Sequence, residues 1–137
     1  MEWSPVPSLP PFSLLLVEDD KLTREVVARM VTLKFPQGTI YTAENGIVGV
    51  ELFRKYAPDI VITDINMPEM DGNEMVREIK TINPNFTYIM LSANNEVKSA
   101  KKSGYCAYLM KPLDFKALFD AIAHCQQEAD APLHIDG

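Results

Sequence analysis

The sequence predicts an α/β protein built as a doubly wound, five-stranded parallel sheet with five flanking helices. Three observations lead to this prediction. Short apolar runs of strand length alternate with longer segments in which apolar residues recur every three or four positions. The runs are continuously apolar, as strands are when helices cover both faces of their sheet. Strand–helix units of this kind, joined by right-handed crossovers, stack into a helix–sheet–helix sandwich.

The first half of the chain alternates twice between the two patterns. The run at 14–17 is continuously apolar, and 39–43 contains the Thr, Ile and Tyr residues that favour strands. Each is followed by a segment with helical spacing, at 21–35 and at 46–56. Asp20 is expected to cap the first helix, because an acidic side chain accepts hydrogen bonds from free helix N–H groups. The apolar residues that define the two helices are Leu22, Val26, Val27, Met30 and Leu33, then Val48, Leu52 and Phe53.

The second half of the chain continues the same alternation. It predicts strands at 60–63, 86–91 and 106–110, and helices at 73–82, 96–103 and 114–127. The helices at 73–82 and 114–127 each place their apolar residues on one face, which is the pattern of a helix packed on a sheet. These residues are Met75, Val76, Ile79 and Ile82, then Phe115, Leu118, Phe119 and Ile122.

The chain has 137 residues, enough for one domain with its own core. We expect that domain at 13–128, between a proline-rich N-terminal arm at 1–12 and a flexible tail or linker at 129–137. The formal net charge of −6 argues against direct binding to nucleic-acid phosphates. No apolar run has the length of a membrane span, and no secretory signal is visible. We therefore expect a cytoplasmic location, with Cys106 and Cys125 reduced.

Acidic and polar residues follow the predicted strands at their carboxyl ends, the edge where ligands bind in open α/β sheets. Glu18 and Asp19 follow the first strand and Asp64 ends the third. These carboxylates would repel one another unless a hard cation such as Mg²⁺ lay between them. Ser92 and Lys111, after the fourth and fifth strands, add a hydroxyl and a positive charge. Together these groups indicate a phosphoryl-binding site with a carboxylate nucleophile, since the chain has no glycine-rich phosphate loop.

Four motifs occur at these strand ends in a fixed order: LLLVEDD (14–20), PDIVITDINMPEMDG (58–72), IMLSA (89–93) and YLMKPL (108–113). With this pattern the chain resembles the receiver domains of two-component response regulators, from about residue 14 to residue 127. The resemblance implies a flavodoxin-like fold with the strand order 2-1-3-4-5, similar to that of chemotaxis regulators. It also implies Mg²⁺ as the cofactor.

The resemblance further implies a role for each matching acidic residue. It identifies Asp64 as the phosphoacceptor. Glu18 and Asp19 match the acidic pair that, together with Asp64, holds the metal ion. Asn66, two residues after the acceptor, would complete the metal site with its backbone carbonyl.

The remaining matches concern the switch. Ser92 and Lys111 would bond the phosphoryl group on Asp64, and Ser92 and Tyr108 would change conformation together. A cis peptide bond is expected between Lys111 and Pro112. One departure is visible, because the stretch from Ser92 to Lys111 is a few residues shorter than the family pattern.

These roles predict a phosphorylation-controlled signalling switch rather than an enzyme with turnover. Asp64 would accept a phosphoryl group from a histidine kinase or a histidine phosphotransfer protein, and the altered output face would act on an unidentified downstream protein. Two alternatives stay open. A Mg²⁺-dependent phosphohydrolase is disfavoured because Asn66 stands where such enzymes commonly carry a second aspartate. The second alternative is a receiver-like binding module that never carries phosphate, and the short stretch from Ser92 to Lys111 keeps it open. A homodimer also stays open.

Overall fold

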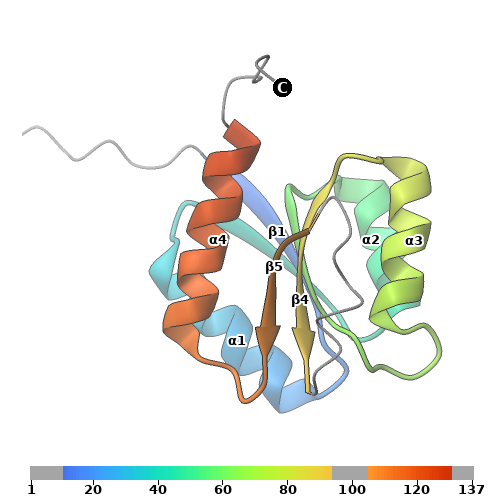
Figure 1. The fold of residues 1–137 in the computed structure, drawn as a ribbon, viewed down its shortest axis with the longest axis horizontal. Coiled ribbons are helices and arrows are strands. Elements are labelled where there is room, and N and C mark those ends of the chain that lie inside the picture. The colour runs from blue at the N-terminus through green and yellow to red at the C-terminus, as the bar shows by residue number, and fades with distance from the viewer. Residues whose placement is uncertain (1–10, 94–104, 131–137) are drawn as a thin grey trace, which may run out of the picture.

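The computed structural model describes residues 11–93 and 105–130 of the chain. Strands and helices alternate along the described residues as the sequence predicts, apart from the segment between the last two strands (Figure 1). The expected helix at 96–103 lies outside the described residues. The elements are β1 (Phe12–Val17), α1 (Lys21–Lys34), β2 (Gly38–Ala43), α2 (Gly46–Tyr56), β3 (Ile60–Asp64), α3 (Gly72–Ile82), β4 (Thr87–Ser92), β5 (Tyr105–Met110) and α4 (Phe115–Asp130).

The five strands form one sheet in the order β2-β1-β3-β4-β5, and every neighbouring pair is parallel. This confirms the doubly wound fold and its strand order. The central strand β3 is buried along its whole length, as a strand covered on both faces must be. Because all strands run the same way, their carboxyl ends share one edge of the sheet, and the residues that follow them meet there.

The helices cover the sheet in two pairs, and each pair closes one part of the core. α1 and α4 pack on one face and α2 and α3 on the other (Figure 1). On the first face the buried helix side chains are Val27, Val31, Leu118, Ala121, Ile122 and Cys125; on the second they are Val50, Phe53, Met75, Val76 and Ile79. Successive side chains of each strand point to opposite faces of the sheet, so every strand contributes apolar residues to both layers.

Helix α1 forms where its periodicity predicts it, but most of the apolar residues that show this periodicity lie on its exposed face. Val27 and Val31 face the sheet. Leu22, Val26 and Leu33, which define the helical spacing in the sequence, are exposed. Two apolar stripes fit the same 3.6-residue period, so periodicity establishes the helix without deciding which stripe packs. The outer stripe thus remains available on the surface of the domain.

Side-chain caps start the three helices that follow β1, β2 and β3. Asp20 accepts from the Thr23 N–H, as expected, and Asn45 accepts from Val48 in the same manner. Asp71 and Glu74 form a reciprocal capping box. Asp20 and Asn45 lie close to the ends of β1 and β2, and Asp71 ends the longer loop 65–71 after β3, so the caps also fix the loops at the carboxyl edge of the sheet.

Two features differ from the sequence prediction. Phe12, at the end of the proline-rich segment, begins β1 and packs edge-on against Phe35, with the ring centroids 5.9 Å apart.

Cys125 is buried in α4 and disulfide-bonded, so the expectation of a reduced thiol is wrong for it. Bonding of this kind depends on how α4 packs, which the spacing of two cysteines in the sequence does not reveal. Within the described ranges, no helix has the length and apolar character needed to cross a membrane.

Candidate functional site

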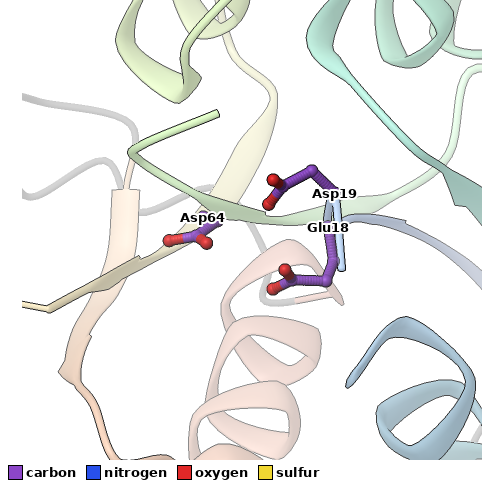
Figure 2. A group of neighbouring side chains, drawn as sticks. All are labelled: Glu18, Asp19 and Asp64. Carbon is purple, nitrogen blue, oxygen red and sulfur yellow. The ribbon is translucent and has the colours of Figure 1, made fainter. Parts of the chain in front are cut away.

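Three carboxylates meet at the carboxyl edge of the sheet. Glu18 and Asp19 directly follow β1, and Asp64 is the last residue of β3. One carboxylate oxygen from each lies within 4.8 Å of the other two, and Figure 2 shows the three side chains gathered at these strand ends. Glu18 is 3% exposed and Asp64 6% exposed, whereas Asp19 is open to solvent. The predicted acidic residues are therefore brought together as expected.

The register of the sheet explains why these residues converge. Val17 of β1 lies opposite Thr63 of β3 in the parallel ladder, so the residues that follow both are neighbours. The Glu18 N–H also donates to the Ala43 carbonyl at 3.0 Å, which extends the β1–β2 pairing by one residue. The start of the acidic loop is thus attached to β2 by the same kind of hydrogen bond as the strand itself.

Lys111 reaches the acidic residues from the end of β5. Its Nζ lies 2.8 Å from Asp64 Oδ2 and 4.0 Å from Glu18 Oε1. One ammonium among three carboxylates leaves a formal charge of −2 at the cluster. Lys111 thus forms an ion pair with Asp64, and this pair balances only part of the negative charge.

Burial and neighbouring charges shift the pKa values of Glu18 and Lys111. Removal from water raises the pKa of Glu18, opposed by the hydrogen bond from the Asp20 N–H and assisted by the negative charge of Asp64. Burial lowers the pKa of Lys111, but its hydrogen bond and attraction to Asp64 outweigh this, so the pKa is raised overall. Lys111 therefore stays protonated at neutral pH and remains a hydrogen-bond donor to an oxyanion.

The other predicted residues lie around this cluster. Ser92 ends β4, is fully buried, and its carbonyl accepts from the Lys111 N–H at 2.8 Å. Tyr108 on β5 lies opposite Met90 of β4 and packs half-buried against the core under α2 and α3. Asn66 is exposed in the loop after β3. The Lys111–Pro112 peptide bond is cis, as expected.

The loop after β3 is folded back tightly on Asp64 and Ile65. The Gly72 N–H donates to the Ile65 carbonyl at 2.7 Å, and a Cβ on Gly72 would collide with the Asp64 carbonyl oxygen. Glycine is therefore required at the start of α3. Glu69 has a left-handed backbone with φ of 71°, and its carboxylate accepts from Asn45 Nδ2 at 3.3 Å. This contact ties the loops after β2 and β3 together.

Sequence reasoning does not single out Arg24, one turn into α1. Its Nη1 donates to the backbone carbonyl of Glu18 at 2.8 Å. The sequence signal available was only an arginine one helical turn after an acidic strand end, and arginines are common on helix surfaces. Only the folded chain shows that this side chain turns back to the site.

The donor set fits a hard divalent cation. The cluster offers carboxylate oxygens only, two of them from buried side chains, and carries excess negative charge. Mg²⁺ favours oxygen ligands in sites that keep some coordinated water, and the exposure of Asp19 leaves the site open to water.

Comparison with known proteins agrees with this geometry. The family model of the response regulator receiver domain matches residues 14–123. The chemotaxis protein CheY of Halobacterium salinarum is 34% identical over 113 residues, covering 80% of this chain and 92% of that protein. The transcriptional regulatory protein DegU of Brevibacillus brevis is 32% identical over 112 residues, covering 80% of this chain and 48% of that protein. The chain thus spans about half or less of the transcriptional regulators it matches.

Solved structures show the same fold. A response regulator receiver domain protein from Clostridium thermocellum superposes with a TM-score of 0.79 at 26% identity, covering 85% of this chain and 95% of that one. The response regulator TrrA of Thermotoga maritima, solved in complex with Mg²⁺-BeF, has a TM-score of 0.74 at 28% identity, covering 83% and 98%. With the parallel sheet, the acidic edge and the family match in agreement, this chain belongs to the response regulator receiver domain family.

Proposed function

We propose that this receiver domain is a signalling switch controlled by phosphorylation of Asp64. One observation carries the proposal: the Asp64 carboxylate is almost fully buried at a strand end, bonded to Lys111 and crowded by two further carboxylates. Buried carboxylates that lack enough positive partners lower the free energy of unfolding, and a bound cation would remove this penalty by neutralising their charge. Relatives named as chemotaxis and transcriptional regulatory proteins support a signalling role.

Mg²⁺ is the cofactor that this site would hold. Glu18, Asp19 and Asp64 supply the carboxylate ligands, and the backbone carbonyl of Asn66 is proposed as a further ligand. When bound, the ion neutralises charge on the transferring phosphoryl oxygens. The Mg²⁺-BeF complex of the Thermotoga relative supports this assignment by similarity.

The chain's own residues perform the transfer. An oxygen of the Asp64 carboxylate attacks the phosphorus of a donor phosphohistidine, and the phosphorus–nitrogen bond breaks as the new phosphorus–oxygen bond forms. The electron pair of the broken bond leaves with the histidine nitrogen. The Lys111 ammonium, already 2.8 Å from Asp64, donates to the incoming phosphoryl oxygens.

The switch would follow from the new charge. Phosphorylation places roughly −2 at Asp64 and offers strong acceptor oxygens. The Ser92 hydroxyl and the Lys111 ammonium are hydrogen-bond donors that follow from the ends of β4 and β5, and Tyr108 on β5 packs half-buried against the core. Movement of Ser92 toward the phosphoryl group would let Tyr108 change its packing, which alters the surface that a downstream protein contacts.

The two alternatives gain no support from the site. A Mg²⁺-dependent phosphohydrolase needs a second acid–base group near the nucleophile, and the residue two positions after Asp64 is the amide Asn66. A binding module without phosphate has no need for a buried acceptor paired with Lys111. We propose self-catalysed phosphotransfer and dephosphorylation as the only chemistry of the domain.

The phosphodonor is proposed to be a histidine kinase or a histidine phosphotransfer protein in the cytoplasm. α1 begins beside the acidic cluster, and its outer stripe starts there with Leu22, which is 70% exposed, and Val26, which is 43% exposed. An apolar patch next to the acceptor suits a helical donor that must bring a phosphohistidine to Asp64. The receiver would span the predicted 13–128, extended to Phe12 at the start of β1 and to Asp130 at the end of α4, with the remaining residues as flanking segments.

The test is phosphorylation by acetyl phosphate in the presence of Mg²⁺, followed by intact mass. The wild type is expected to gain one phosphoryl group, and Asp64→Asn to gain none while keeping its circular dichroism spectrum. Asp59→Asn, the same change at the other end of β3, is the matched control and should be phosphorylated as the wild type is. Stoichiometric phosphorylation of Asp64→Asn would contradict the assignment.

A further inference from the structure

Arg24 contacts the backbone of the acidic residues that follow β1. It lies one turn into α1, is half-buried, and its Nη1 donates to the Glu18 carbonyl oxygen at 2.8 Å. The contact spans from the helix back to the strand end.

Three hydrogen bonds hold Glu18. Its N–H donates to the Ala43 carbonyl at 3.0 Å, and its Oε2 accepts from the Asp20 N–H at 3.0 Å. Its carbonyl is held by Arg24. The peptide plane between Glu18 and Asp19 is therefore fixed at its oxygen, and because a peptide unit is planar, this also fixes the direction in which Asp19 leaves the backbone.

We infer that Arg24 is a positioning residue for the metal site, acting through the Glu18–Asp19 peptide plane. The inference rests on the proposed function and deepens it, because it assigns a cationic side chain a favourable role in binding a cation. Partners of this kind hold ligand groups in the geometry that the metal requires, and their loss commonly lowers metal affinity.

The two effects of Arg24 on Mg²⁺ binding have opposite signs. Its positive charge repels a second cation, so removing the charge alone would tighten Mg²⁺ binding. Its hydrogen bond holds the two neighbouring carboxylates in place, so removing the bond would weaken binding. The sign of the change in the dissociation constant therefore separates positioning from simple electrostatics.

The experiment is calorimetric titration with MgCl₂ at neutral pH, at a temperature where every variant is folded. Arg24→Met is expected to raise the dissociation constant roughly tenfold. Arg24→Lys keeps the charge and one donor, and is expected to recover part of the loss. Arg29→Met is the matched control, since it removes the same charge from an exposed position of α1, and its constant is expected within about twofold of the wild type.

A second readout separates positioning from a structural role. The increase in melting temperature that Mg²⁺ causes should be smaller in Arg24→Met than in the wild type, and saturating Mg²⁺ should restore the rate of phosphorylation by acetyl phosphate. Unchanged or tighter Mg²⁺ binding by Arg24→Met, or equal weakening by Arg29→Met, would overturn the inference while leaving the proposed function intact. Failure of the wild type to bind Mg²⁺ would refute the metal site itself and this inference with it.

Discussion

The carboxylates at the two ends of β1 and β3 differ in their partners. At the amino end, Asp59 precedes β3 and accepts from the backbone N–H of Ser13 at 2.9 Å and from its hydroxyl at 3.4 Å. The Asp59 N–H returns a bond to the Ser13 carbonyl at 3.0 Å. At the carboxyl end, Glu18, Asp19 and Asp64 lie close together, and Lys111 pairs with Asp64 at 2.8 Å and with Glu18 at 4.0 Å.

The difference shows what each end is built for. A solvent-exposed carboxylate with local donors, such as Asp59, is satisfied by the chain itself and serves as a clasp between strands. Buried carboxylates that outnumber their cations leave charge for a ligand to neutralise. The carboxyl end therefore carries negative charge that the proposed Mg²⁺ ion would neutralise, whereas the carboxylate at the amino end is satisfied by donors of the chain itself.

The largest effect on this comparison is expected from Lys111→Met. Removing the ammonium leaves buried Asp64 and Glu18 without their cation, so the free energy of unfolding at pH 7 should fall by about 2 kcal/mol in the absence of Mg²⁺. Urea denaturation with and without MgCl₂ measures it. Mg²⁺ should stabilise the variant more than the wild type, because the ion replaces the missing charge. An equal loss in both conditions would show that Lys111 acts by packing alone.

The second prediction concerns the outer stripe of α1, which runs from the carboxyl end to the amino end of the sheet. Leu22 and Leu33 are equally exposed, at 70% and 71%, but only Leu22 lies beside the site. Leu22→Ser should slow phosphotransfer from a donor protein roughly tenfold, about 1.4 kcal/mol, without affecting acetyl phosphate. Leu33→Ser is the control and should transfer at the wild-type rate. Equal slowing by both variants would argue against docking at the site end.

The third prediction is a gain in stability from Glu18→Gln. The raised pKa of Glu18 means that the folded protein holds this proton more tightly than the unfolded chain does. Stability contributed by the protonated form is complete below the ordinary value of 4.5 and is lost as the pH rises through the raised value. Glutamine cannot ionise and can still accept from the Asp20 N–H.

The variant should therefore be more stable than the wild type by about 1 kcal/mol at pH 7 without Mg²⁺, with the advantage vanishing at low pH. Thermal unfolding across the pH range measures it. The same variant should bind Mg²⁺ more weakly. A variant less stable than the wild type at neutral pH would show that the Glu18 charge is fully compensated in the free protein.

The smallest effect is expected from the same chemical change at the amino end. Asp59→Asn retains an oxygen acceptor for the Ser13 N–H but loses the charge that strengthens the bond, so stability should fall by no more than about 0.5 kcal/mol. Mg²⁺ affinity should not change. Urea denaturation beside Glu18→Gln makes the comparison direct, because neutralising a carboxylate is expected to stabilise one end of the sheet and slightly destabilise the other. If both variants changed the free energy of unfolding in the same direction, the proposed difference between the two ends of the sheet would be wrong.

Much of the fold and the site could be predicted from sequence because the signals are local. Asp64 and Lys111 each follow an apolar run, and parallel strands bring such positions to one edge whatever the details of packing. Helix caps such as Asp20 are equally local. The buried stripe of α1 was less accessible, because two stripes shared the same period. The bonded state of Cys125 depends on contacts between segments far apart in the chain.

The sequence alone determined the alternation of strands and helices, the edge that carries the acidic residues, and the family motifs that name Asp64 and Lys111. These follow from periodicity and from residue order, which any fold with parallel strands must respect. Only the tertiary structure decided how many charges meet, which of them are buried, and that Arg24 turns back from α1 to hold the Glu18 carbonyl. Desolvation and hydrogen-bond geometry depend on distances between side chains, and such distances exist only once the helices have packed on the sheet.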